Sequence, residues 1–172
     1  MRRSVILLTL LAVPLTAAGF PPVVTKSFTP PMVGVNQVST LTITLTNPNP
    51  FSLFGASIAD NFPPGLVNAG PFPGTGSSTC AGAIVFAGPN ALSMVNGTIP
   101  ANGSCTLTAP VLSASPGLYQ NDTGSLFTGA GTSLGGGSAT LTVVPASQIP
   151  TLSELTLALL CVALCAAGLS RT

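Results

Sequence analysis

The chain has 172 residues, and only four basic and three acidic side chains carry a formal charge, which is 4% of the total. An ordinary soluble domain has about 25% charged residues, so this chain has too few charges to bind nucleic acid by releasing counterions. It has no histidine, and its many serine and threonine hydroxyls therefore lack the base that would make them nucleophiles. We expect a non-catalytic protein without a cofactor or a metal.

Residues 1–19 have the layout of a cleavable secretory signal. Arg2 and Arg3 precede an apolar stretch from Val5 to Leu15, and small residues follow it. The stretch is too short to cross about 30 Å of hydrocarbon, and Pro14 would break a helix there. We therefore predict a signal peptide and secretion of the remaining chain across the inner membrane.

Residues 20–145 alternate with a period of two, which predicts strands that are buried on one face. Leu41, Ile43 and Leu45 alternate with threonines, which would cover the outer face of the same strand. The other predicted strands are Val23 to Phe28, Leu53 to Ala59, Ala83 to Ala87, Leu92 to Val95, Cys105 to Val111, Leu118 to Asp122 and Ala139 to Val143.

Proline, glycine and asparagine mark the turns between these strands. No window of this region has helical spacing, so we predict an all-β fold, an immunoglobulin-like antiparallel β-sandwich of seven to eight strands. The turn signals are Thr29-Pro30-Pro31, Asn47-Pro48-Asn49-Pro50, Pro63-Pro64-Gly65, Asn96-Gly97 and Asn102-Gly103, and we expect those at 47–50 and 63–65 to lie on the surface.

Cys80 and Cys105 are the only cysteines of the predicted exported body. Cys105 is in phase with the inward-facing residues of its strand, and an oxidising compartment would join the pair. A disulfide closing a loop of about 25 residues stabilises a fold by roughly 3 to 4 kcal/mol in the chain-entropy model. A redox-active pair is the alternative, although the C-x-x-C spacing is missing.

Two further segments contain residue types that occur in binding sites. Asp60 could join Asn61 in a calcium site, but so few carboxylates rarely suffice, and we expect the Asp60 carboxylate to accept backbone N–H bonds in the turn before Pro63. The glycine-rich stretch Gly129 to Ser138 lacks the spacing of a dinucleotide-binding loop, so we expect a flexible hairpin loop.

The order of several segments between residues 21 and 144 resembles the conserved repeat (DUF11-like) domains of bacterial surface proteins. This resemblance implies an immunoglobulin-like module at the cell surface, and it brings no catalytic residue. Only one copy is present here. The segments that carry it are Thr25 to Pro30, Ser39 to Ile43, Asn47 to Asn49, Asp60 to Leu66 and Gly103 to Leu107.

Residues 146–172 contain an apolar segment from Leu155 to Leu169, followed by Arg171, which predicts a short transmembrane helix. The hexapeptide before it resembles the start of IPTL-CTERM tails, a variant of the PEP-CTERM-type sorting signals of bacteria. The resemblance implies an exosortase-like processing protease as a partner. The motif residues are Ile149, Pro150, Thr151, Leu152, Ser153 and Glu154.

A eukaryotic GPI signal is the competing interpretation of this tail, with small residues at Ala146 and Ser147 before a spacer and an apolar end. The three sequons at Asn96, Asn102 and Asn121 would suit it, but such tripeptides often arise by chance.

Taken together, these features predict a non-catalytic secreted structural module of the cell surface or extracellular matrix, sorted through its C-terminal tail. The tail helix would tether it to the membrane either briefly or permanently. The alternative is an adhesin-like module that binds exopolysaccharide or another surface protein. Aromatic side chains exposed together on one sheet face would favour binding, and buried aromatics would favour a passive spacer.

Overall fold

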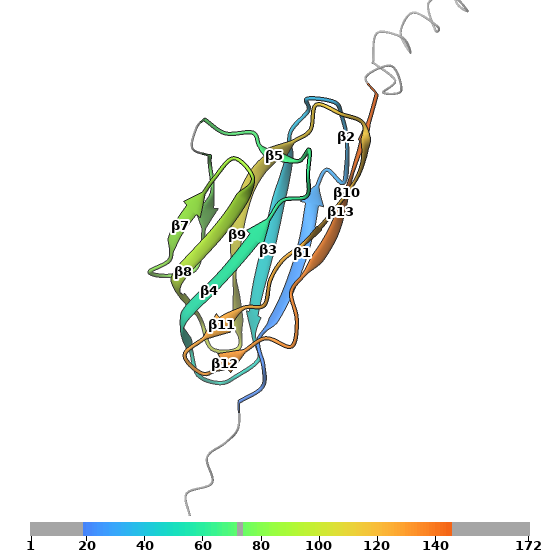
Figure 1. Ribbon diagram of the computed structural model, residues 1–172. Helices are drawn as coiled ribbons and strands as arrows, with labels where there is room; N and C mark the ends of the chain where they lie inside the picture. The colour runs from blue at the N-terminus through green and yellow to red at the C-terminus, as the bar shows by residue number, and fades with distance from the viewer. Residues whose placement is uncertain (1–18, 72–73, 146–172) are drawn as a thin grey trace, which may run out of the picture.

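The computed structural model describes residues 19–71 and 74–145, which form thirteen strands and contain no helix (Figure 1). The predicted signal peptide, the transmembrane segment and the IPTL motif lie outside the described residues, apart from Gly19. Within the described ranges, no helix is long and apolar enough to cross a membrane.

The first sheet has the strand order β1-β3-β9-β5, and β6 also pairs with β9. Its central strands carry the predicted alternation: Leu41, Ile43 and Leu45 are fully buried, whereas the threonines between them are partly exposed. Ile43 lies opposite Leu107 across the central pair. The strands are β1 (Val23–Thr29), β3 (Ser39–Asn47), β5 (Val67–Asn68), β6 (Ser77–Ser78) and β9 (Gly103–Leu112).

The second sheet faces the first and has the order β12-β11-β4-β8-β7. Ala56 and Ile58 of β4 and Leu92 and Met94 of β8 point inward and are buried. The strands are β4 (Leu53–Asn61), β7 (Ile84–Ala87), β8 (Ala91–Ile99), β11 (Phe127–Thr128) and β12 (Gly131–Thr132).

A three-stranded sheet, β10-β13-β2, closes one side of the sandwich. It consists of β10 (Gly117–Asp122), β13 (Ser138–Val144) and β2 (Met32–Gly34), and β13 pairs with β2 in parallel. A bridge between Asp60 and Thr123 joins the end of β10 to β4, and β13 lies beside β1 (Figure 1). The first strand of the domain is thereby brought close to β13, the last strand.

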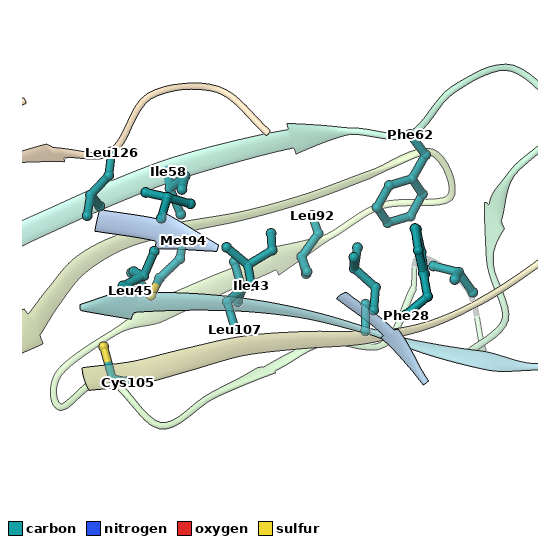
Figure 2. Packing of buried hydrophobic residues seen from close by; sticks show 14 of the residues in the cluster. Phe28, Ile43, Leu45, Ile58, Phe62, Leu92, Met94, Cys105, Leu107 and Leu126 are labelled. Carbon is teal, nitrogen blue, oxygen red and sulfur yellow. The ribbon is translucent and has the colours of Figure 1, made fainter. Parts of the chain in front are cut away.

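The core lies between the two large sheets and consists mainly of aliphatic side chains, with Phe28 and Phe62 at one end (Figure 2). Residues from both layers meet there, including Ile43 and Leu107 from one sheet and Ile58, Leu92 and Met94 from the other. Burial of such side chains contributes roughly 1.5 to 3 kcal/mol each relative to an exposed state. This interior is the main source of stability.

The prediction of an all-β sandwich is confirmed, and the eight predicted strands correspond to β1, β3, β4, β7, β8, β9, β10 and β13. The total is higher because β2, β5, β6, β11 and β12 have only two or three residues each. Strands of two or three residues are too short to show a full alternation of apolar and polar side chains, so the sequence pattern does not reveal them.

Two turn predictions need correction. Asn96-Gly97 lies inside β8, where Asn96 has a φ of 59° and the register with β4 shifts, so the pair forms a bulge. The prediction of a surface turn at 47–50 was wrong for its asparagines, because Asn47 and Asn49 are buried. The Asn47 Nδ2 donates to the Phe51 carbonyl oxygen at 2.8 Å, and the Asn49 Nδ2 donates to the Phe20 carbonyl oxygen at 2.8 Å.

The stretch Gly129 to Ser138 contains β12, which pairs with β11, so the predicted hairpin is present. Two of the glycines that follow pass close to neighbouring backbone. The Thr123 N–H donates to the Gly137 carbonyl oxygen at 2.8 Å, and a side chain at Gly136 would collide with the Thr123 carbonyl oxygen. These glycines are needed because the backbone passes so close to its neighbours.

Candidate functional site

Three strands each place one polar residue on the inward-facing side, where their other residues are apolar. Lys26 lies between Val24 and Phe28 in β1, and Asp60 follows Ile58 in β4. Asn121 follows the buried Tyr119 in β10. We call Lys26, Asp60 and Asn121 the buried triad.

The Asp60 carboxylate connects the other two members of the buried triad. The Lys26 Nζ donates to Oδ1 of Asp60 at 2.7 Å, and the Asn121 Nδ2 donates to Oδ2 of Asp60 at 3.0 Å. The side chains of Lys26 and Asp60 are fully buried, and Asn121 is 1% exposed. Both nitrogen atoms are therefore held against one carboxylate in the interior of the protein.

The backbone just before β13 passes close to Lys26. A Cβ atom added at Gly137 would lie 3.0 Å from the Lys26 Cβ, so only glycine allows the chain to pass this close.

Burial shifts the protonation equilibrium of Lys26 toward the neutral amine. Burial lowers the pKa of the Lys26 amine below its ordinary value, and this effect outweighs the hydrogen bond and the charge of Asp60, which raise the pKa. Asp122, the other described carboxylate, is exposed; hydrogen bonds from Ser138 and Gln120 lower its pKa.

Two oxygen atoms beside the buried triad are buried without a hydrogen-bond partner among the described residues: Asn121 Oδ1 and Thr123 Oγ1. A buried polar atom without a partner costs roughly 1 to 3 kcal/mol. The amide of Asn121 cannot simply be reversed to relieve this, because its oxygen would then face the Asp60 carboxylate. The side-chain oxygen of Asn121 therefore has no hydrogen bond among the described residues, whereas its side-chain nitrogen donates to Asp60.

The prediction for Asp60 was wrong, since its carboxylate pairs with Lys26 and Asn121 and not with backbone N–H groups of a turn. Its oxygens are also not gathered with other acidic ligands, and the described part of the chain holds no group of three or more metal-ligating side chains. Sequence reasoning missed the buried triad. The only signal was the period-two phase of Lys26, Asp60 and Asn121 with their buried neighbours, which places each residue on an inward-facing side but does not pair them.

The disulfide predicted between Cys80 and Cys105 is present. Both residues are 4% exposed, and Cys105 belongs to β9 while Cys80 lies just after β6. Such burial suits a structural disulfide better than a redox-active one, which needs access to its substrate.

The second feature of interest is the outer face of the sheet that contains β4 and β8. Phe86 lies opposite Ser93, and Phe127 lies opposite Ser57, so small residues stand between exposed aromatic ones. Phe86 and Phe127 are 56% and 58% exposed. A shallow hollow of about 340 Å³ is lined by Phe127 together with Ser57, Ala59, Ser93 and Val95, among others. We call this surface the aromatic face.

Other aromatic residues divide between core and surface. Phe28, Phe62 and Tyr119 are buried, while Phe20, Phe51 and Phe54 are exposed away from the hollow. Asn121 is also buried, so its sequon is closed to glycosylation in the folded domain. The sorting-motif residues 149–154 lie outside the described part of the chain.

Residues 22–143 match the model of a family described as Domain of unknown function (DUF7933). The match covers more than half of the chain. The resemblance to DUF11-like domains stays a prediction. No curated protein sequence matches the chain.

Several solved structures share the fold. A cohesin ScaC from Acetivibrio cellulolyticus, solved with the ScaB dockerin, has a TM-score of 0.53 and 14% identity over 71% of this chain and 99% of its own. A cohesin module of a Clostridium perfringens family 33 glycoside hydrolase has a TM-score of 0.51 and 9% identity over 74% of this chain and 98% of its own. At such identities the likeness establishes the sandwich fold alone.

The pilus backbone protein RrgB from Streptococcus pneumoniae has a TM-score of 0.50 and 14% identity over 64% of this chain. This chain covers 32% of RrgB, about a third of its length. The matched region is therefore only part of RrgB.

Proposed function

The chain belongs to the DUF7933 family, and from this premise we propose that it is a non-catalytic module of the bacterial cell surface or extracellular matrix. The observation that carries the proposal is the buried disulfide between Cys80 and Cys105. Disulfides of this kind persist in oxidising compartments outside the cytoplasm. The secretory layout of residues 1–19 agrees with such a location.

The surface of the described domain supports a structural role. Lys26, Asp60 and Asp122 are its only charged residues, and the first two are sealed inside. The exterior carries threonine, serine and asparagine side chains and offers no exposed cluster of acids and bases for catalysis.

We propose further that the tail directs the final location. The hexapeptide Ile149 to Glu154 followed by an apolar segment supports recognition by an exosortase-like membrane protease. The apolar segment is short, which suits a transient stop in the membrane better than a permanent anchor.

Cell fractionation of the producing bacterium tests this location. The full chain should be accessible to protease added to intact cells, with Cys80 and Cys105 blocked to thiol reagents. A variant that lacks residues 2–18 should remain inside the cell and have both thiols free. Free thiols and protection from protease in the full chain would overturn the proposal.

A binding module is the second candidate, and the aromatic face favours it because flat exposed rings bind sugars and apolar peptides. The double variant Phe86→Ser with Phe127→Ser should lose retention on the bacterium's own exopolysaccharide or envelope proteins. Phe20→Ser is the matched control, since Phe20 is 71% exposed but lies away from the hollow. Equal retention of both variants would remove this candidate.

A further inference from the structure

The buried triad is hard to explain as a stabilising ion pair. Moving a lysine and an aspartate out of water carries a desolvation penalty that often exceeds their mutual attraction, and apolar replacements of such pairs are often neutral or stabilising. Yet two of the three charged residues in the described domain occupy this position. The arrangement therefore calls for a chemical explanation.

Three groups of matching reactivity meet there: an amine, a carboxamide and a carboxylate. Asp60 holds the Lys26 Nζ at 2.7 Å on one oxygen and the Asn121 Nδ2 at 3.0 Å on the other. An amine attacking a primary amide needs a neutral nitrogen, and it needs a group that moves a proton from the attacking nitrogen to the leaving one. A carboxylate placed between the two nitrogens can do this.

From this geometry we propose that Lys26 and Asn121 join in an intramolecular amide bond, with Asp60 as the proton-transferring group and ammonia as the product that leaves. This modification site goes beyond the proposed function, since it does not depend on where the chain resides. It would tie β1, the first strand of the domain, to β10.

The reaction balances without an added reagent. Lys26 first gives one proton to Asp60, which leaves a neutral amine and a carboxylic acid. The Nζ lone pair then bonds to Cγ of Asn121, and the carbonyl electrons move to Oδ1. Asp60 protonates Nδ2 and takes a proton from Nζ. The Cγ–Nδ2 bond breaks, the carbonyl re-forms, and ammonia departs; nothing is oxidised or reduced.

Several observations suit this sequence of steps. Burial lowers the pKa of the Lys26 amine, which reduces the cost of forming the neutral nucleophile. Oδ1 of Asn121, where negative charge would develop, has no partner among the described residues, so the carbonyl is not held in its ground state. The sealed, apolar surroundings keep water from competing as a nucleophile.

Mass spectrometry of the full chain, purified, denatured and reduced, tests the proposal. Peptide mapping should give a branched peptide that contains Lys26 and Asn121 and is lighter than the sum of its parts by about 17 Da, the mass of one ammonia. Trypsin should also fail to cleave after Lys26, because its amine is acylated. Asp60→Asn, Lys26→Met and Asn121→Ala should each abolish the branched peptide.

A matched control is needed because Asn-Gly pairs can lose ammonia by cyclising on their own backbone. Asn96-Gly97 and Asn102-Gly103 could do so, but that loss would map to their own peptides and would persist in Asp60→Asn. Recovery of Lys26 and Asn121 from the wild-type chain in separate peptides of unmodified mass would overturn the proposal. This outcome is decisive even if a variant fails to fold.

Discussion

The Nζ of Lys26 lies 2.7 Å from Oδ1 of Asp60, and neither side chain reaches solvent. The two residues come from β1 and β4, which belong to the two facing sheets. The pair therefore joins the two layers through the interior of the sandwich. Most other side chains in that interior are apolar.

The first prediction separates a cross-link from a simple ion pair. The triple variant Lys26→Met, Asp60→Leu, Asn121→Leu removes all three polar groups and leaves an apolar core. If these groups form only an ion pair, the free energy of unfolding should stay similar or rise. If the amide forms, it closes a loop of roughly 100 residues, and its loss should lower the free energy of unfolding by about 4 to 5 kcal/mol.

Chemical denaturation of both proteins measures the difference. Wild-type protein with Cys80 and Cys105 reduced should still be the more stable of the two under the same reducing conditions. A triple variant as stable as the wild type would contradict the cross-link.

The second prediction concerns the disulfide. Replacing Cys80 and Cys105 with serine should lower the free energy of unfolding by about 3 to 4 kcal/mol, because the bridge spans 25 positions in the sequence. Thermal unfolding checks this, and reduced wild-type protein is the control. Reduction that leaves the wild-type melting temperature unchanged would show that the disulfide does not stabilise the fold.

The third prediction compares two adjacent glycines. Gly136→Ala should destabilise the domain by about 1 to 3 kcal/mol, because the new methyl group would collide with the Thr123 carbonyl oxygen and push the chain away. Gly135→Ala should have little effect, since nothing lies within 4 Å of a Cβ at that position. Equal melting temperatures for the two variants would contradict the packing described here.

The fourth prediction concerns the core. Leu107 is fully buried opposite Ile43, so Leu107→Ala should cost about 2 to 5 kcal/mol through lost burial and the cavity left behind. Leu134 is 92% exposed, and Leu134→Ala should change the free energy of unfolding by less than about 0.5 kcal/mol. Urea denaturation of both variants measures the two changes in the free energy of unfolding. Similar changes would contradict the burial of Leu107 in the core.

The long strands could be predicted because their alternation is nearly complete. Leu41, Ile43 and Leu45 between threonines identify the face of β3 without any knowledge of its partners. The bulge at Asn96 could not be predicted, since Asn-Gly is a turn signal in most sequences and pairing with β4 and β7 keeps this segment in a strand.

The disulfide was predictable for a similar reason, because Cys80 and Cys105 have no competitors in the predicted exported body. The buried triad was not, even though each member is in phase with buried neighbours. A charged residue at an inward-facing position is normally assigned to a turn or an edge, because its burial needs a partner. Here the partners lie far apart in sequence, 34 positions from Lys26 to Asp60 and 61 from Asp60 to Asn121.

The proposal that this chain is an exported module sorted through its tail is tested most directly by terminal peptide mapping of protein extracted from the surface of the producing bacterium. The mature form should lack residues 1–19 and should end at or before the motif Ile149 to Glu154. Recovery of intact Leu155 to Thr172 on the mature protein would contradict processing and leave a membrane-tethered sandwich, and a form that retains residues 1–19 inside the cell would contradict export itself.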